Sequence, residues 1–277
     1  MIPGKKIPFF KMSGSGNDFI VIDNRSGVIS ISEGSNAARR LCRPKVSVGA
    51  DGLILIESPA QSGTDFKWRF YNADGSEAEM CGNGGRCAAR FAYVNGIAGQ
   101  KMVFETLAGL IKAEVLDLRV NLEMVRPHGL RPGIKILTNG DPWVLHFINT
   151  GVPHAVCLLP ELESIDVREI GRKIRFHEEF QPAGANANFV KVLDKNSIAI
   201  RTYERGVEDE TLACGTGSVA GAIIASLREG VKSPVCVHTR GGETLNVYFK
   251  SAPDGICDVF LEGEARIIYE GLIWEAL

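Results

Sequence analysis

The sequence predicts an α+β protein of two pseudo-symmetric domains, each a curved, mainly antiparallel sheet around a central helix. Its 277 residues are enough for two domains of ordinary size. Many short strand-like runs and few helix-like ones favour a mixture of sheet and helix. In addition, one cysteine-containing segment occurs twice: residues 80–89 read MCGNGGRCAA, and residues 213–222 read ACGTGSVAGA.

The duplication extends beyond the cysteines. Residues 66–72 (FKWRFYN) and 198–204 (IAIRTYE) both alternate as strands do, and each is followed by a glycine-containing turn before its cysteine. Residues 16–21 and 151–156 both begin with glycine and precede their cysteines by a similar distance. Matches at one offset indicate two halves of one ancestral unit.

A helix is expected after each cysteine. Residues 85–94 have helical apolar spacing and end at Asn95-Gly96, a typical C-cap. Residues 218–227 end before Gly230 and are apolar nearly all round, which predicts a helix that is buried on every side. These two helices are the expected centres of the two domains.

The other short apolar runs predict strands. They are residues 7–11, 19–23, 53–57, 103–106, 109–115, 144–149, 156–159, 189–193, 235–238, 244–250 and 257–261.

The pattern breaks near Arg126-Pro127-His128, which places the linker within residues 116–132. We therefore expect an N-terminal domain of residues 1–122, which carries Cys81 and is completed by a last strand within residues 264–277. The C-terminal domain is residues 123–263 and carries Cys214. The active site is expected in the cleft between the two domains.

Charge and hydropathy exclude several classes of partner. The formal net charge of -2 gives no electrostatic reason to bind nucleic acid or an anionic membrane. No apolar run approaches the roughly 20 residues that a membrane span requires. The first residues lack the apolar stretch of a secretory signal, so a cytoplasmic protein is expected.

Seven cysteines occur without any Cys-x-x-Cys pair, which argues against a zinc knuckle or a thioredoxin-type site. A reducing compartment and mostly buried thiols are expected. Those predicted to be core residues are Cys42, Cys87, Cys157, Cys236 and Cys257.

The two repeated cysteines have the setting of reactive thiols. Each opens a helix, where free backbone amides and the helix dipole stabilise a thiolate. Two such thiols suit a reaction that needs an acid and a base of equal strength on opposite sides of one carbon. The amides of Gly82, Asn83, Gly215 and Thr216 could hold a carboxylate and so acidify its α-carbon.

Three other interpretations fit parts of the pattern. The glycine-rich segment could cradle phosphate, although it lacks the Gly-Lys-Ser/Thr ending of a P-loop. The two cysteines could form a structural disulfide. One cysteine could be a hydrolase nucleophile with His154 or His177 as base, but this does not explain why the segment occurs twice.

The sequence resembles the diaminopimelate epimerases, a family of cofactor-independent amino acid epimerases. The resemblance spans essentially the whole chain and distinguishes this group from proline racemases and hydroxyproline epimerases, which share the two-thiol plan. It is carried by residues 10–19 (FKMSGSGNDF), 70–76 (FYNADGS), 80–86 (MCGNGGR), 153–154 (PH), 185–186 (AN), 203–206 (YERG) and 213–217 (ACGTG).

The resemblance implies a function and a set of site residues. Cys81 would act as base on LL-diaminopimelate and Cys214 on the meso isomer, with neither pyridoxal phosphate nor metal. His154 and Glu204 would tune the thiol pKa values, and Arg205 would bind the distal carboxylate. The other implied substrate contacts are Asn17, Asn72, Gly82, Asn83, Asn186, Glu204, Gly215 and Thr216.

It also implies a place in lysine and peptidoglycan precursor synthesis and a homodimer with Tyr269 at the interface. The small-molecule substrate would be the only ligand, without nucleic acid or membrane.

Two positions depart from the family pattern. Many members have Asn where this chain has Val152, and some have Gln where it has Gly52, so two distal contacts are expected to differ. Asn188 is a candidate substitute for one of them. A proline-type racemase and a non-catalytic carboxylate-binding protein remain as alternative functions.

Overall fold

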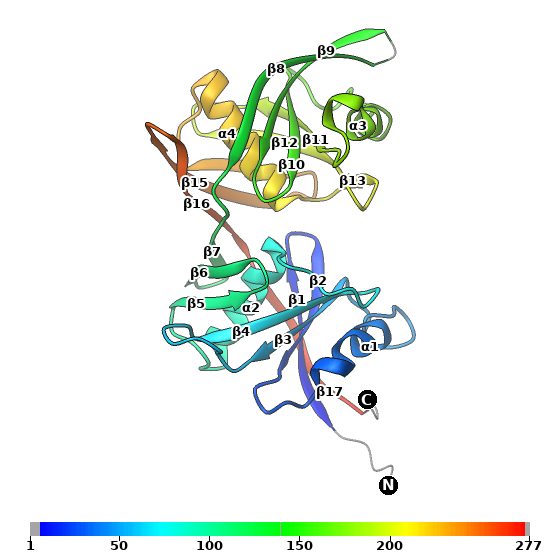
Figure 1. Cartoon of the computed structure of the whole chain (residues 1–277), viewed down its shortest axis with the longest axis vertical. Coiled ribbons are helices and arrows are strands. Elements are labelled where there is room, and N and C mark those ends of the chain that lie inside the picture. Colours follow the sequence, from blue (N-terminus) through cyan, green and yellow to red (C-terminus); the bar gives the residue numbers. More distant parts are fainter. Residues whose placement is uncertain (1–5, 139, 275–277) are drawn as a thin grey trace. The chain divides into compact units, whose positions relative to one another are not determined.

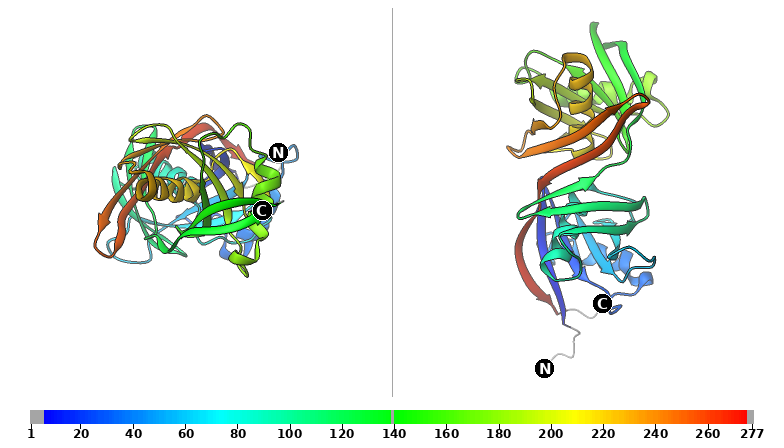
Figure 2. Two further views of the ribbon diagram at one scale, coloured as in Figure 1. Left: turned by 90° about the horizontal axis from the view of Figure 1, so that it is seen from above. Right: turned by 90° about the vertical axis from the view of Figure 1, so that its left-hand side faces the viewer.

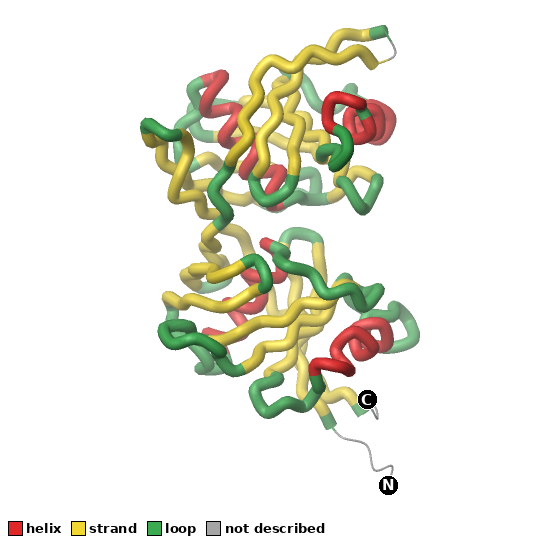
Figure 3. The backbone as a smooth tube through the Cα atoms, in the orientation of Figure 1, coloured by secondary structure: helices red, strands yellow, loops and turns green. Residues whose placement is uncertain are grey.

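The computed structural model describes residues 6–138 and 140–274 and divides the chain into two compact units. The first unit runs to Leu122 and resumes at Gly263, and the second is Glu123–Glu262. Strands make up most of each unit, with helices packed against them (Figures 1 and 3). The predicted α+β class is therefore confirmed.

The first unit contains one continuous sheet. Its strands pair in the order β17–β1–β2–β3–β4–β5–β6–β7, and all pairs are antiparallel except β2–β3 and β4–β5. Figure 2 shows β1 and β17 running side by side although they come from opposite ends of the chain. The strands are β1 (Ile7–Gly14), β2 (Asn17–Asp23), β3 (Gly52–Glu57), β4 (Phe66–Asn72), β5 (Lys101–Thr106), β6 (Gly109–Leu116), β7 (Arg119–Glu123) and β17 (Arg266–Ile273).

The second unit repeats this pairing pattern. Its order is β8–β9–β10–β11–β12–β14–β15–β16, in which only β10–β11 and β12–β14 are parallel, and β13 adds to β12. The strands are β8 (His128–Thr138), β9 (Asp141–Asn149), β10 (Pro153–Leu158), β11 (Asn186–Val192), β12 (Ser197–Glu204), β13 (Asp209–Thr211), β14 (Val235–His238), β15 (Thr244–Ala252) and β16 (Gly255–Glu264).

The helices occupy equivalent places in the two units. α1 (Ile31–Leu41) and α3 (Val167–Phe176) each connect the first parallel pair of strands, whereas α2 (Gly82–Val94) and α4 (Gly215–Glu229) connect the second. A short 3₁₀ turn, η1 (Glu178–Phe180), follows α3. The repeat that the sequence shows around its cysteines is thus a repeat of the whole topology.

α2 and α4 are the predicted central helices, and both begin three residues earlier than the apolar spacing indicates. α2 packs on β1, β2, β3 and β6, and α4 packs on strands β9 to β12, β14 and β15. Every residue from Gly217 to Ala225 is buried, as the all-round apolar pattern predicts. Both predicted C-caps are confirmed: Asn95 ends α2, and Gly230 ends α4 with a φ of 74°.

The sequence analysis missed the two outer helices. α1 buries only Gly34, Ala37, Ala38 and Leu41, so its buried face consists largely of small residues and lacks the apolar run that predicts the central helices. Gly34 packs directly on the ring of Tyr71, and Gly171 of α3 packs in the same way on Tyr203. Each glycine lets its helix approach the sheet closely.

Three further details bear on the sequence-based expectations. The boundary between the units at Leu122 and the strand-free residues 124–127 both lie within the range 116–132 expected for the linker, although β7 and the start of β8 occupy other parts of that range. Register shifts in β8 fall on either side of Arg131. Cys42, Cys87 and Cys157 are buried as predicted, but Cys236 and Cys257 are partly exposed. None of the helices in the described part of the chain has the length and apolarity needed to cross a lipid bilayer.

Candidate active site

Cys81 and Cys214 are the N-cap residues of α2 and α4. Their backbone angles are close, with φ and ψ of −142° and 118° for Cys81 and −125° and 113° for Cys214. Each cysteine carbonyl accepts a hydrogen bond from the residue four positions later, at 2.7 Å from Gly85 N and 2.9 Å from Ser218 N. The backbone amides of residues 82–84 and 215–217 lie within this first turn, in the arrangement that holds anions.

The two thiols differ in exposure. Cys81 is partly exposed, whereas Cys214 is 7% exposed and its Sγ lies 3.5 Å from Oγ1 of Thr216. The predicted carboxylate-binding residues Gly82, Gly215 and Thr216 are half-buried, and Asn83 is buried. Each unit therefore presents a thiol beside accessible helix amides.

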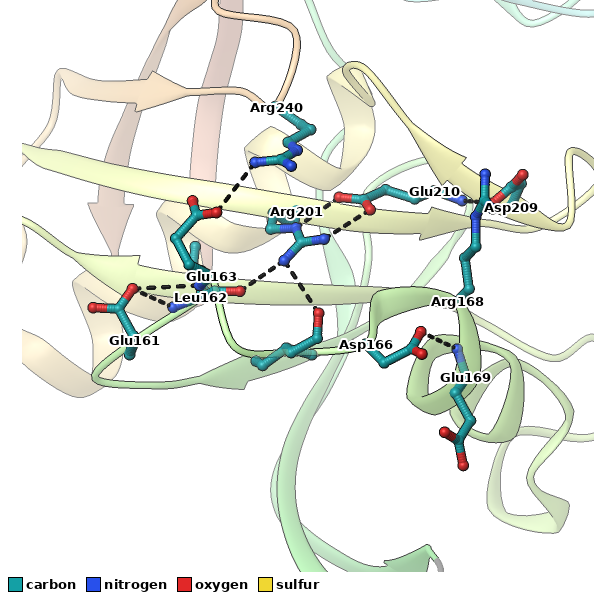
Figure 4. Close-up of polar contacts among 11 residues, drawn as sticks. Glu161, Leu162, Glu163, Asp166, Arg168, Glu169, Arg201, Asp209, Glu210 and Arg240 are labelled. Atoms are coloured by element: carbon teal, nitrogen blue, oxygen red, sulfur yellow. Dashed lines mark hydrogen bonds and ion pairs between the residues drawn. The ribbon is translucent and has the colours of Figure 1, made fainter.

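An arginine–glutamate pair fixes the strand that leads into each cysteine. In the second unit, Arg201 of β12 binds both carboxylate oxygens of Glu210 in β13, at 2.7 and 2.8 Å (Figure 4). In the first unit, Arg69 of β4 binds Glu77 at 2.9 Å. Glu77 and Glu210 each stand four residues before their cysteine. Each half therefore has an arginine–glutamate ion pair just before its cysteine, although Arg69 also binds Glu57.

Arg201 also ties this strand to the segment before α3. Its guanidinium donates to the carbonyl oxygens of Leu162 and Ile165, at 2.7 and 3.2 Å (Figure 4). Next to it, Arg168 of α3 pairs with Asp209 of β13 at 2.6 Å. Because β13 ends three residues before Cys214, these contacts restrict the path of the chain into α4.

In the first unit, a chain of hydrogen bonds orients two predicted substrate contacts. Arg86 is fully buried and donates to Oδ1 of Asn83 at 2.8 Å, and it also contacts the hydroxyl of Ser15. Nδ2 of Asn83 donates to Oδ1 of Asn17 at 2.8 Å. Nδ2 of Asn17 in turn donates to Asp51 at 2.8 Å. Arg86 and Asp51 thus fix which way both amides face.

Asn72 lies at the end of β4, apart from this chain of hydrogen bonds. Its side chain donates to the hydroxyl of Ser76 at 3.0 Å, and it pairs across the sheet with Gly52. A Cβ at Gly52 would lie 2.5 Å from the ring of Phe70 and 2.8 Å from the carbonyl of Tyr71. The departure at Gly52 is therefore more than a lost contact, because the Phe70 ring occupies the space of a side chain there.

In the second unit, Asn186 holds the turn that carries Arg205. Oδ1 of Asn186 accepts from the backbone N–H of Arg205 at 2.7 Å, and its Nδ2 donates to the carbonyl of Pro153 at 3.0 Å. The guanidinium of Arg205 is half-buried and donates to the carbonyl of Ala183 at 3.1 Å. Asn186 and Arg205 are therefore brought together, as the resemblance implies.

Glu204 precedes Arg205 and lies in a partly buried position. Burial raises the pKa of its carboxyl group, while the hydroxyl of Thr211, which donates to it at 2.9 Å, acts in the opposite direction. The carboxyl group therefore releases its proton less readily than an exposed glutamate does.

His154 and Asn188 are completely buried neighbours. The Nδ1 atom of His154 lies 3.0 Å from Nδ2 of Asn188, and Oδ1 of Asn188 accepts from the hydroxyl of Thr202 at 3.0 Å. Burial lowers the pKa of His154 to about 3, so the imidazole is neutral near pH 7. Asn188 is 1% exposed and fully engaged, which contradicts the expectation that it replaces a substrate contact.

Tyr269 lies on β17, away from the α2 N-terminus in sequence. It is 46% exposed and packs edge-on against Phe9 at 5.9 Å between ring centroids. Ile268 and Leu272 on the same strand are also exposed.

Known proteins match this chain over most of its length. The sequence pattern described as diaminopimelate epimerase matches residues 9–126 and 146–267. The diaminopimelate epimerase of Aquifex aeolicus is 49% identical, with 96% of this chain and 98% of that protein covered. The diaminopimelate epimerase of a Hydrogenobaculum species is 47% identical, with 95% and 97% covered.

The chain belongs to the diaminopimelate epimerase family. It is accordingly an isomerase. Solved structures of other families share the fold at low sequence identity. A PhzF-family phenazine biosynthesis protein of Bacillus anthracis has a TM-score of 0.74 at 14% identity over 97% of this chain and 99% of that one. A probable proline racemase of Agrobacterium radiobacter has a TM-score of 0.68 at 14% identity over 98% and 93%.

The alternative interpretations lose support within a diaminopimelate epimerase family member. The likeness to proline racemase is one of fold alone at 14% identity. His177 caps η1 by accepting from Glu179 N at 3.2 Å, and His154 is held by Asn188, so neither is placed as a hydrolase base by its contacts. Residues 6–138 and 140–274 contain no group of three or more histidine, cysteine, aspartate or glutamate residues that could hold a metal ion.

The structure adds supporting residues that the sequence analysis did not name. Two of them, Arg86 and Asp51, orient amides in the first unit. The pairs Arg69–Glu77 and Arg201–Glu210 do have a sequence signal. In both halves an Arg-x-Tyr segment is followed by a glutamate, and this glutamate stands four residues before the cysteine. The role of Asn188 has no such sequence signal, because it depends on contacts between three strands.

Proposed function

We propose that this chain converts LL-2,6-diaminopimelate to the meso isomer by a two-base mechanism in which Cys81 and Cys214 act on one α-carbon. The observation that carries the proposal is the duplicated N-cap cysteine, with nearly equal backbone angles at the start of two equivalent helices. Epimerisation requires proton removal on one face and delivery on the other, so it needs two groups of similar acidity. Membership of the diaminopimelate epimerase family supports the substrate.

In the proposed forward reaction, the Cys81 thiolate takes the α-proton of the LL isomer and becomes a thiol. The electron pair of the broken C–H bond remains on the substrate as a carbanion. Cys214 then gives its thiol proton to the opposite face and becomes a thiolate. In the reverse reaction the roles are exchanged, with Cys214 acting as base on the meso isomer.

The α-carboxylate is proposed to bind the amides of Gly82, Asn83, Gly215 and Thr216. Negative charge that leaves the α-carbon spreads onto these carboxylate oxygens, where helix N-terminal amides already donate hydrogen bonds. This stabilises the carbanion without a cofactor's electron sink. A Cβ added at Gly82 would meet no other atom within 4 Å, so there is room for a ligand at the start of α2.

The distal end of the substrate carries an ammonium group and a second carboxylate. Arg205 is the proposed partner of that carboxylate, since a guanidinium binds a carboxylate through two parallel hydrogen bonds. Glu204, Asn17, Asn72 and Asn186 are proposed to supply the remaining polar contacts. Oδ1 of Asn17 accepts from Asn83, and one N–H of its side-chain amide donates to Asp51. The second N–H of this amide is the proposed donor to substrate.

The proposal also covers the setting of the reaction. We place it in lysine and peptidoglycan precursor synthesis, in the cytoplasm, where a reducing environment keeps cysteine side chains in the thiol state. The chain is proposed to work as a homodimer with Tyr269 in the interface, supported by the exposed apolar side chains of β17.

The test is incubation of reduced protein with LL-diaminopimelate in deuterated water, followed by NMR. The expected result is deuterium at one α-carbon together with meso product. A matched incubation with L-proline should give no exchange. Exchange with L-proline alone would favour the proline-type reaction, and exchange with neither would leave only a binding role.

A further inference from the structure

Three buried positions differ in character between the two units. The registers of β2–β3–β4 and β10–β11–β12 correspond, because Leu53 pairs with Tyr71 as Ala187 pairs with Tyr203. These registers make an apolar set in the first unit equivalent to a polar set in the second. The apolar set is Phe19, Ile54 and Phe70, and the polar set is His154, Asn188 and Thr202.

The fold itself does not require the polar set. In the first unit, Phe19 and Phe70 pack edge-on with centroids 5.9 Å apart, and Ile54 is fully buried beside them. Burial of polar groups costs free energy unless their hydrogen bonds are made, so an apolar set is the simpler solution for a core. The polar set therefore points to a task that only the second unit performs.

The hydrogen bonds of Asn188 fix the orientation of its amide. Nδ2 lies 3.3 Å from the carbonyl oxygen of Ala155 and 3.4 Å from that of Asn186, and both can only accept. The other polar atom of this amide, Oδ1, accepts a hydrogen bond from the hydroxyl of Thr202. A flipped amide would place its oxygen against two carbonyl oxygens, so the NH₂ group must face His154.

This orientation determines where His154 carries its proton. The amide nitrogen of Asn188 has no lone pair to give, so Nδ1 of His154 at 3.0 Å must be the acceptor. A neutral imidazole has one protonated nitrogen, and that nitrogen is then Nε2. Nε2 is buried and has no hydrogen-bond partner among the described residues.

The same amide lies against the first turn of α4. A Cβ on Gly217 would be 2.5 Å from Oδ1 of Asn188 and 3.3 Å from Sγ of Cys214. The equivalent glycine of the first unit, Gly84, would instead meet Ile54 at 3.3 Å. Asn188 thus connects His154 to the helix start that carries Cys214, whereas Cys81 has an apolar neighbour in that place.

We propose that Asn188 is a positioning residue that holds neutral His154 in the Nε2–H tautomer, so that His154 serves the reaction as a hydrogen-bond donor and not as a base. The catalytic part of this role rests on the proposed epimerase reaction, but the tautomer does not. An Nε2–H donor favours negative charge on the group it faces, such as a thiolate or a carboxylate, without exchanging a proton with it.

The test is NMR of the full-length protein with ¹⁵N-labelled histidine, which separates protonated from unprotonated ring nitrogens. His154 is assigned by the signals that His154→Gln loses. The expected result is a protonated Nε2 and an unprotonated Nδ1 at neutral and mildly acidic pH. A protonated Nδ1, alone or in an imidazolium, overturns the proposal.

Asn188→Leu tests the positioning residue directly. Without the hydrogen bond that Asn188 donates to Nδ1 of His154, the single tautomer should become a mixture. The value of kcat should fall about tenfold, as expected for one lost hydrogen bond in the transition state. Asn24→Leu is the matched control, since Asn24 is a similarly buried asparagine of the first unit whose side chain bonds the backbone of Ile29. This control should leave both tautomer and kcat unchanged.

An unchanged tautomer in Asn188→Leu would overturn the positioning role even if kcat falls. If that variant does not fold, the measurement on the unmodified protein still decides the tautomer. If the unmodified protein shows the Nε2–H tautomer but does not epimerise diaminopimelate, the proposed function fails while the assignment of the tautomer stands.

Discussion

Nδ2 of Asn83 donates a hydrogen bond of 2.8 Å to Oδ1 of Asn17, which joins the first turn of α2 to the first residue of β2. The two residues are 66 positions apart in sequence. Arg86 holds the far side of Asn83, and Asp51 holds the far side of Asn17, so neither amide can rotate without breaking two hydrogen bonds. The helix start that carries Cys81 is thereby fixed to the sheet by side-chain hydrogen bonds.

Replacement of either Cys81 or Cys214 by alanine should abolish epimerisation. In the proposed mechanism each thiol is the base in one direction and the acid in the other, and loss of one such group typically lowers the rate by about 10²–10⁴-fold. The measurement is meso product formation from the LL isomer. Cys236→Ala, which removes a partly exposed thiol of β14, is the control and should keep its turnover. Near-normal turnover in either single variant would disprove the two-base mechanism.

The two arginine–glutamate pairs should each control their own cysteine. Arg69→Met should alter the alkylation rate of Cys81 by iodoacetamide and leave Cys214 unchanged, because Arg69 binds Glu77 just before Cys81. Arg201→Met should do the reverse through Glu210. Alkylation at each site is followed by peptide mass spectrometry.

Arg25→Met is the matched control for these variants. It breaks an exposed arginine–aspartate pair with Asp23, a residue outside both cysteine segments. If the arginine variants change both cysteines equally, a general loosening of the protein is the better explanation and the positioning role is wrong.

Alanine at Gly34 or Gly171 should destabilise the protein. A new Cβ would overlap Tyr71 in the first case and Tyr203 in the second, and overpacking of this kind costs about 1–3 kcal/mol. At an exposed helix position, glycine to alanine instead stabilises by about 0.4–1 kcal/mol. Urea unfolding gives the free energies, with Asn36→Ala on the exposed face of α1 as control. A stabilised variant would mean that the helix does not pack this closely.

The free energy of unfolding should fall as the pH is lowered from about 6.5 towards 3. Burial lowers the pKa of His154 from 6.5 to about 3 in the folded state, so only the unfolded chain gains this proton in that range. The slope contributed is at most about 1.4 kcal/mol per pH unit. Denaturant unfolding of the unmodified protein and of His154→Gln at several pH values isolates the contribution of His154 to this pH dependence.

The raised pKa of Glu204 has the opposite sign, because the folded state then holds a proton that the unfolded chain has released. That contribution is present at low pH and is lost as the pH rises through the folded-state pKa. The unmodified protein and His154→Gln both retain Glu204, so its contribution cancels in the difference between their free energies of unfolding. Equal slopes for the two proteins would contradict the neutral, buried state of His154.

Tyr269→Arg should weaken the proposed homodimer. The side chain is 46% exposed on β17, and a charge placed in an apolar interface is strongly unfavourable. Sedimentation velocity over a range of concentrations gives the mass. Tyr93→Arg is the control, since Tyr93 is 44% exposed near the end of α2. A monomeric unmodified protein, or equal masses for both variants, would remove Tyr269 from any interface.

Much of the candidate site could be predicted from local sequence. Cysteine followed by Gly-x-Gly and a small-residue apolar run predicts a helix start, and both helices begin there. Asn186 and Arg205 were predicted as site residues, and the structure joins them by a hydrogen bond. The substrate roles of these residues stay predictions, as do those of Asn17, Asn72 and Glu204.

The outer helices and the supporting residues could not be predicted in the same way. α1 buries mainly glycine and alanine, and α3 buries only three residues, so neither contains the apolar run that predicts the central helices. Arg86, Asp51 and Asn188 are ordinary polar residues in sequence, and their contacts with Ser15, Asn17 and His154 form only when segments distant in the chain pack together. The same reason explains Gly52, whose missing side chain reflects the ring of Phe70 on the next strand.

The sequence by itself determined the α+β class, the duplication, the family and the two cysteines, because each depends on residues close together in the chain or on a pattern repeated along it. Only the tertiary structure decided how the two halves differ. Phe19 and His154 occupy equivalent places in one repeated topology, yet one belongs to an apolar core and the other to a buried hydrogen-bonded set. Such differences depend on hydrogen bonds between strands that are far apart in the sequence, as between His154 and Asn188. A local sequence pattern cannot predict these hydrogen bonds.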